Sequence, residues 1–255
     1  MRPPRLRMAL RVWQRHARVF LKLWRHALPG PLIDPLLFLL ALGFGLGSYV
    51  GDVQGGSYPE FLAPALCACA AMWAASFETT YVLFWRMHEG RVHDNVLTTP
   101  VEVEDIVLGE LLWAGTRACL HGTSFLLVIA ALGYVDSRFA LLLPPFLFLG
   151  GLTFAGVGMA FTMFVRTMDS LAAFFTLVLN PMFLFGGVFY PTEMLPGWAQ
   201  PIAWLAPTQH LVGIARALTS GAHVETIASD AVWLTVSTML LAVVPLLVLR
   251  RRLVL

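Results

Sequence analysis

The chain has 255 residues, of which 58% are hydrophobic and only 13% are charged. A water-soluble domain needs more polar side chains than this to cover its core, so the composition excludes one and predicts an integral membrane protein. The formal net charge of +2 says little about partners, but the basic residues are spread very unevenly along the chain.

Residues 1–28 predict a basic amphipathic helix. At about 100° per residue, the basic side chains share one narrow arc, and large apolar side chains cover the other side. The basic arc holds Arg7, Arg11, Arg15, Arg18, Lys22 and Arg25, and the apolar side holds Leu10, Val12, Trp13, Val19, Phe20, Leu23, Trp24 and Leu28. Such a helix is typical of the membrane interface, with anionic lipid as its nearest target. The alternative, a solvated basic tail, leaves the two tryptophans unexplained.

The rest of the chain, residues 29–255, predicts one membrane domain with six helical spans, since about 20 apolar residues cross a bilayer once. The spans are expected at 32–50, 61–85, 106–133, 139–165, 171–190 and 228–249. Small residues in the fourth span, such as Gly151 and Gly158, favour close helix packing within the chain or against a second subunit. The fold class is therefore all-α, with six transmembrane helices.

The basic residues predict the orientation of these spans. Eight of the 17 precede the first span, and others follow the second, fourth and sixth spans, whereas only Arg138 and Arg216 fall on the opposite side. Cytoplasmic loops carry the excess of arginine and lysine, so both termini are expected in the cytoplasm.

The longest inside loop, residues 86–105, predicts a short helix on the cytoplasmic side. Its charges alternate in sign, and its apolar residues can form a small ridge. The charged residues are Arg86, Glu89, Arg91 and Asp94, and the ridge is Val92, Val96 and Leu97. A new helix is then expected, with Thr99 as its cap, Pro100 at its first position and Glu102 at its third. An ordinary polar connector is the alternative for this loop.

Ionisable residues inside the spans are costly and indicate function or helix pairing. Glu78 in the second span and Arg117 in the third lie at similar depths, so they can form a buried ion pair. This pair can fix the two spans together or contact cargo, and His121 lies one turn beyond Arg117. Asn180 precedes Pro181, which predicts a kink in the fifth span.

Catalytic and metal sites are not indicated. The three cysteines lie inside predicted spans, and the seven histidines form no ligand set. His88 and His93 share a loop with Asp94, but such isolated groups are usually solvated. The single lysine, Lys22, lies between two leucines, so the chain has no phosphate-binding loop for ATP. Nucleic acid is also a poor partner for basic residues that line a membrane-facing helix.

Residues 183–218 are broken by prolines and glycines and contain several aromatic residues. These residues include Gly186, Gly187, Tyr190, Pro191, Pro196, Trp198 and Pro207. In hydrocarbon every backbone amide needs a partner, so such a segment must pack within protein or lie at the membrane face. A simple membrane anchor does not need it.

Two stretches resemble the permease subunits of type-2 ABC exporters, most of all the nodulation protein J (NodJ) branch. The first runs from MWAASFETTY (72–81) through the loop 86–100 to VEVEDIVLGELLW (101–113). The second contains Asn180-Pro181, Gly186-Gly187, Tyr190-Pro191, Leu195-Pro196, Trp198, Pro207, His210 and Arg216.

The resemblance implies a homodimer in the bacterial inner membrane that pairs with two copies of a separate ATPase subunit. ATP and Mg would be bound by that partner. The segment from about His88 to Leu97, within the coupling loop 86–105, would be the coupling helix that docks on it. Residues 183–218 would be re-entrant helices that bound an outer gate, with Gly186, Gly187, Tyr190, Pro191, Pro196, Trp198 and Pro207 as the gate residues. The cargo implied is a lipo-oligosaccharide, a lipid-linked glycan, another lipid or a hydrophobic drug. A secondary transporter driven by an ion gradient, with Glu78, Arg117 and His121 as a relay, is the alternative, and a scaffold that moves nothing is a third.

Overall fold

The computed structural model describes residues 4–27, 29–90, 92–221 and 225–253, and all its regular elements within these ranges are helices. The α-helices are α1 (Leu6–Ala27), α2 (Pro29–Phe38), α3 (Gly47–Val50), α4 (Tyr58–Phe77), α5 (Leu83–His88), α6 (Val92–Leu97), α7 (Val103–Ala131), α8 (Leu143–Thr162), α9 (Leu171–Phe174), α10 (Asn180–Phe185), α11 (Gln200–Leu205), α12 (Pro207–Ser220) and α13 (Thr226–Leu253). Three segments have π-helical geometry: η1 (Leu39–Leu46), η2 (Glu78–Val82) and η5 (Phe175–Leu179). Three short segments are 3-10 helices: η3 (Arg138–Leu142), η4 (Met168–Ser170) and η6 (Thr192–Met194).

Within the described residues, six helical stretches are long and apolar enough to cross a membrane, as the sequence predicted. They are Leu32–Val50, Tyr58–His88, Val103–Ala131, Arg138–Thr162, Met168–Phe185 and Thr226–Pro245. The fifth ends earlier than expected, because the chain turns at Gly186 and Gly187, the second of which has a φ of 73°. The chain is therefore a multi-pass membrane protein.

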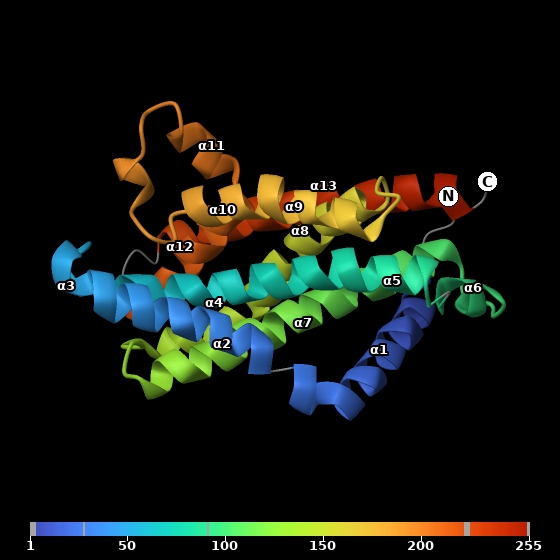
Figure 1. The fold of residues 1–255 in the computed structure, drawn as a ribbon, viewed down its shortest axis with the longest axis horizontal. Helices are drawn as coiled ribbons and strands as arrows, with labels where there is room; N and C mark the ends of the chain where they lie inside the picture. The colour runs from blue at the N-terminus through green and yellow to red at the C-terminus, as the bar shows by residue number, and fades with distance from the viewer. Residues whose placement is uncertain (1–3, 28, 91, 222–224, 254–255) are drawn as a thin grey trace.

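The long helices lie along one axis, with α4 among α7, α8 and α12 (Figure 1). One end of the bundle carries α5, α6 and both termini, and the other end carries α3, α11 and α12. This arrangement agrees with an even number of spans.

Small residues of α8 face neighbours within the chain. A methyl group added at Gly150 would lie 2.6 Å from Leu211 of α12, and one at Gly158 would lie 2.5 Å from Thr79 of η2. Gly151 is equally close to Ala118 of α7. The close packing predicted from these small residues is thus found between α8 and other helices of the same chain.

The start of α7 differs from the expectation. Thr99 and Pro100 lie outside the helix, and the N-cap is Glu102, whose side chain and that of Asp105 form the capping interactions. The Thr99 hydroxyl instead donates to the carbonyl of Val96, at the end of α6. The prediction was wrong because Asp105 also accepts from the backbone N–H of Arg5, a contact between distant segments that no local pattern reveals.

The distortion expected at Asn180 is present. The π-helical segment η5 ends at Leu179, and α10 begins with Asn180 and Pro181. Proline removes a backbone donor and crowds the preceding turn, which explains why regular geometry fails there.

Candidate functional site

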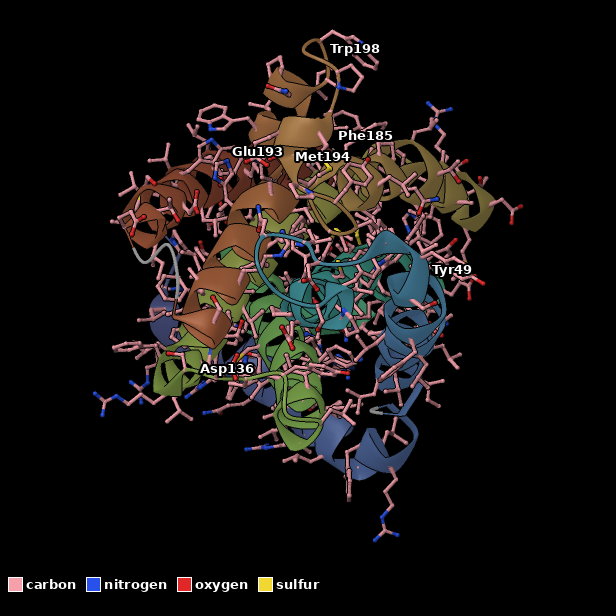
Figure 2. All side chains as sticks on the ribbon, turned by 90° about the vertical axis from the view of Figure 1, so that its left-hand side faces the viewer. Tyr49, Asp136, Phe185, Glu193, Met194 and Trp198 are labelled. Carbon is pink, nitrogen blue, oxygen red and sulfur yellow. The ribbon has the colours of Figure 1, made fainter. Side chains whose placement is uncertain are left out.

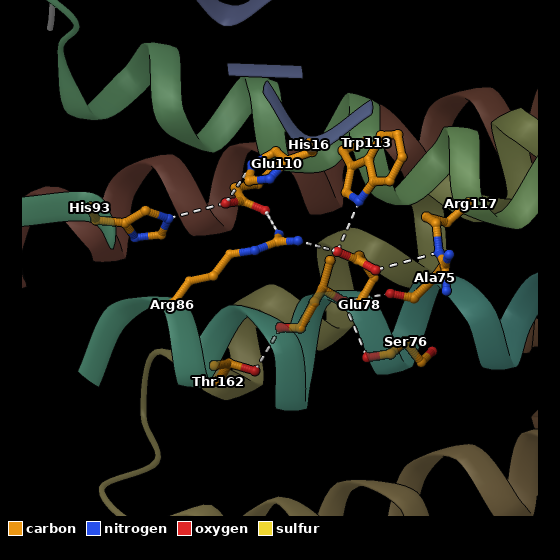
Figure 3. Close-up of polar contacts among 11 residues, drawn as sticks. His16, Ala75, Ser76, Glu78, Arg86, His93, Glu110, Trp113, Arg117 and Thr162 are labelled. Carbon is orange, nitrogen blue, oxygen red and sulfur yellow. Dashed lines mark hydrogen bonds and ion pairs between the residues drawn. The ribbon is translucent and has the colours of Figure 1, made fainter. Parts of the chain in front are cut away.

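A network of buried charges lies near the end of the bundle that carries α5 and α6 (Figure 3). Its two carboxylates are Glu78, in η2, and Glu110, in α7. Arg86 of α5 bridges them: its Nη2 lies 2.6 Å from Glu78 Oε1, and its Nη1 lies 2.6 Å from Glu110 Oε2. The side chain of Glu110 is only 2% exposed. A carboxylate buried this deeply is tolerated only with a cation or donors at its oxygens, and Arg86 supplies them to both.

Two residues of α7 complete the surroundings of Glu78. The indole Nε1 of Trp113 donates to Glu78 Oε1 at 2.9 Å, and Arg117 Nε lies 3.5 Å from Glu78 Oε2. Glu110, Trp113 and Arg117 are spaced by three and four residues, which places them on one face of α7. The expected pair of Glu78 with Arg117 is present, but it is longer than the contact with Arg86. Two carboxylates are thus matched by two guanidinium groups.

Two histidines converge on the remaining oxygen of Glu110. Nε2 of His16, from α1, and Nε2 of His93, from α6, each lie 3.0 Å from Glu110 Oε1. Both rings are buried. The expectation that His93 is solvated was wrong, because α6 turns this ring inward. The network therefore connects α1, α5, α6 and α7 through one carboxylate.

Sequence reasoning missed Glu110 and His16. A glutamate near the beginning of a span is expected at the membrane surface, and His16 lies in a segment assigned to the interface. The available signal was the spacing of Glu110 with Trp113 and Arg117 on one helical face.

Helix α1 is held against α7 by close packing. A methyl group added at Gly109 would lie 2.6 Å from Val12 Cβ, so the absence of a side chain there lets α1 approach. Trp13 Nε1 donates to Thr116 Oγ1 at 2.9 Å, and Arg5 Nη2 lies 3.1 Å from Asp105 Oδ2. These contacts hold the ring of His16 over Glu110.

Comparison with known proteins shows the family. Residues 11–219 match the family model described as ABC-2 type transporter. The chain belongs to the ABC-2 type transporter family. It is a transmembrane permease subunit without an ATPase domain, and members of this family use a separate ATPase to bind ATP. This membership favours ATP-driven transport over the ion-gradient alternative.

Curated relatives of the permease cover most of its length. It is 39% identical to Nodulation protein J of Rhizobium meliloti (strain 1021) over 210 residues, which is 82% of this chain and 80% of the relative. It is 36% identical to Nodulation protein J of Rhizobium leguminosarum bv. viciae over 244 residues, 96% of this chain and 94% of the relative. It is 25% identical to the Inner membrane transport permease YadH of Escherichia coli (strain K12) over 203 residues, 79% and 78% of the two chains. The permease is therefore NodJ-like over nearly its whole length.

The loop residues assigned to ATPase coupling occupy different environments in this permease. Glu89 is exposed, Val92 and Val96 of α6 are half-buried, and Arg86 is turned into the charge network. Arg86 therefore lies behind the loop surface rather than on it. Arg91 lies outside the described residues, and nothing is described of the side chains of Asp94 and Leu97.

The other polar residues predicted inside the spans do not gather at one site. His121 is buried, and its Nδ1 lies 2.8 Å from the carbonyl oxygen of Arg117. Asn180, the first residue of α10, is exposed, and none of the hydrogen bonds or ion pairs of Glu78 found among the described residues includes it.

The glycines and prolines of the outer segment have local structural roles. A methyl group at Gly186 would lie 2.7 Å from Thr208 Cβ, and Gly187 adopts a positive φ that favours glycine. The hydroxyl of Tyr190 donates to the carbonyl of Leu184 at 2.9 Å.

The prolines of the outer segment lie at the ends of its short helices. Pro207 begins α12, where its missing N–H costs nothing. Pro191 precedes η6, Pro196 lies in the turn before α11, and Trp198 is exposed at the tip (Figure 2).

Arg216 of α12 is held without a carboxylate. Its Nε donates to the carbonyl of Phe61 at 3.1 Å, its Nη2 donates to the carbonyl of Val188 at 3.0 Å, and its guanidinium lies 3.5 Å from the centre of the Phe61 ring. None of the ion pairs found among the described residues includes it. Burial lowers the pKa of Arg216 to about 9, which leaves it protonated at neutral pH.

Proposed function

We propose that this permease is one of two identical membrane subunits of an ATP-driven exporter in a bacterial inner membrane. Two copies of a cytoplasmic ATPase subunit, which bind ATP and Mg, supply the energy. The end of the bundle with α5, α6 and both termini faces the cytoplasm, in agreement with the excess of basic residues there. The observation that carries the proposal is the contact of His93, on the short helix α6, with Glu110 inside the bundle.

The loop 86–105 is the point at which the ATPase acts on the permease. Helix α6 and the exposed Glu89 form its docking surface, together with Arg91, Asp94 and Leu97 of the same loop. Movement of α6 acts through His93 on Glu110, and through Arg86 on Glu78. Because separating buried charged partners is strongly unfavourable, these residues move as one unit and transmit the displacement to the second and third spans.

Helix α1 lies in the cytoplasmic membrane interface. Its basic residues Arg7, Arg11, Arg15 and Arg18 point outward, where anionic lipid headgroups can bind them, while Val12 and His16 pack inward. The contact of His16 with Glu110 ties this interfacial helix to the same joint.

The cargo is an amphiphile of the lipo-oligosaccharide or lipid-linked type. The similarity to Nodulation protein J over 96% of the chain in one relative supports this class. The outer segment 183–218, with Gly186, Gly187, Tyr190 and Trp198, forms the outer gate that opens when the ATPase pair closes.

The test separates docking from transmission with two variants of the full chain, each co-purified with a candidate ATPase subunit that associates with the unaltered permease. Glu89→Lys alters the exposed docking surface, so the amount of ATPase that co-purifies is expected to fall. His93→Leu removes a buried hydrogen bond to a charged group, worth about 2 kcal/mol, so it is expected to leave association intact and lower cargo-stimulated ATP hydrolysis. Asp52→Lys, on an exposed turn at the opposite end, is the matched control.

Normal association, hydrolysis and export in both variants would reject the loop as the coupling point. Export that continues without any ATPase would reject ATP-driven transport itself.

A further inference from the structure

A cavity of about 500 Å³ opens at the outer end of the bundle, far from the charge network. Its walls come from the turn before α4 and the first residues of α4, the loop before η3, the turn after α10, η6 and helix α12. Figure 2 looks onto this end, with Glu193 on one side and Asp136 on the other. The volume lies within the range of about 300 to 1,000 Å³ that is typical of small-molecule sites.

Donors at one side of the cavity come from Arg216. Two of its N–H groups are used by the carbonyls of Phe61 and Val188, and a guanidinium carries five. Arg216 lines the cavity, so its remaining N–H groups are the donors that this residue would offer to a ligand there.

Hydrogen-bond acceptors also line the cavity. Glu60, Asp136 and Glu193 line the cavity, and all three are exposed. Among the lining residues that the structure describes, the charged ones are thus three carboxylates and one guanidinium. An anion would face an excess of carboxylates, and a simple cation would face the guanidinium, so neither suits the whole cavity.

Gln209 also lines the cavity, and one of its polar atoms has no hydrogen-bond partner. Its Nε2 lies 3.5 Å from Thr192 Oγ1, but its buried Oε1 has no hydrogen-bond partner. A buried amide oxygen left in this state is unfavourable by about 1 to 3 kcal/mol, and rotation toward the cavity would let it accept from a ligand. Tyr134, Thr192 and Ser220 add further polar groups to the lining.

The geometry points to a binding site for a neutral, hydroxyl-rich group, such as one or a few sugar units, on the outer side of each permease. Hydroxyl groups both donate and accept, so a sugar can donate to the carboxylates and to Gln209 while it accepts from Arg216. The site lies outside the charge network and is reached from the exterior. It rests on the proposed function only in that the exported molecule is the source of the sugar.

The experiment measures binding directly, with the full chain in nanodiscs and without ATPase. The probes are three tetrasaccharides: neutral N-acetylglucosamine, cationic glucosamine and an anionic galacturonate. Saturable binding of the neutral probe is expected, with weaker binding of the galacturonate. Gln209→Leu and Glu193→Gln are each expected to weaken binding of the neutral probe roughly tenfold. This is the loss of affinity expected when one hydrogen bond is removed, whether or not the bond involves a charged group. Met194→Gln, an exposed change next to Glu193 but outside the lining, is the control and should leave affinity unchanged.

Thermal unfolding shows whether each variant remains folded. If Gln209→Leu unfolds, Glu193→Gln, which alters an exposed side chain, still tests the site. Absence of saturable binding of the neutral probe, binding of the glucosamine alone, or equal affinity in all variants would each overturn the site. Such a result, with ATPase coupling through α6 intact, leaves the proposed export function standing. Conversely, sugar binding without ATPase association would reject the export function alone.

Discussion

The two ends of the bundle each bury an arginine, but they stabilise it in different ways. At the end with α6, Arg86 lies between two carboxylates, each 2.6 Å away. At the outer end, Arg216 is held by two backbone carbonyls and the ring of Phe61.

The difference matters for what each end can do. Carboxylates neutralise Arg86 and fill its surroundings, so the network forms a stiff joint among four helices. Carbonyls and an aromatic ring solvate Arg216 without neutralising it, and a cavity lies beside it. The first arrangement suits transmission of movement, and the second suits recognition of a ligand.

Replacing Arg86 is expected to have the largest effect on stability. Arg86→Met leaves the carboxylates of Glu78 and Glu110 without their shared cation in a buried site. The free energy of unfolding should fall by about 3 to 5 kcal/mol, the usual cost of breaking a buried ion pair. Thermal unfolding of the purified chain in nanodiscs measures the change.

Arg138→Met is the control for this variant, since Arg138 is exposed at the outer end. The double variant Arg86→Met, Glu110→Gln should recover part of the loss, because one of the uncompensated charges is then removed. If Arg86→Met destabilises no more than Arg138→Met, the network is not the joint described here.

Replacing Arg216 is expected to lower the free energy of unfolding by less than replacing Arg86 does. Arg216→Met leaves the carbonyls of Phe61 and Val188 without their donor but creates no unpaired buried carboxylate. The expected loss is about 2 kcal/mol in the same unfolding measurement. A loss equal to or greater than that of Arg86→Met would contradict the distinction between the two ends.

The sequence was sufficient to predict the membrane spans but not the charge network around Glu110. Span length and the break at Pro181 follow from local chemistry, so six spans and the distortion at Asn180 were predicted correctly. The bridging role of Arg86 required knowing that η2 and α5 form one continuous helix facing α7. Only tertiary packing brings His16 and His93 to the same oxygen of Glu110.

The same limit explains the misplaced start of α7. Thr99 and Pro100 have good capping chemistry, but Arg5, from the distant N-terminal segment, binds the Pro100 carbonyl and Asp105. These contacts select Glu102 as the cap instead. The local sequence pattern also does not reveal which residues contact the ATPase, so the roles of Glu89, Val92 and Val96 remain predictions.

The smallest expected effect concerns the turn that presents the Val188 carbonyl to Arg216. Gly187 has a φ of 73°, and a methyl group there would lie 3.1 Å from Thr192 Cγ2. Gly187→Ala should therefore lower the free energy of unfolding by about 1 kcal/mol, the cost of placing a side chain in the left-handed region. Gly197→Ala, where a methyl group meets nothing within 4 Å, is the matched control. If both variants unfold alike, the conformation of this turn does not stabilise the contact of Arg216 with the Val188 carbonyl. Arg216 is then held by its contacts with Phe61 alone.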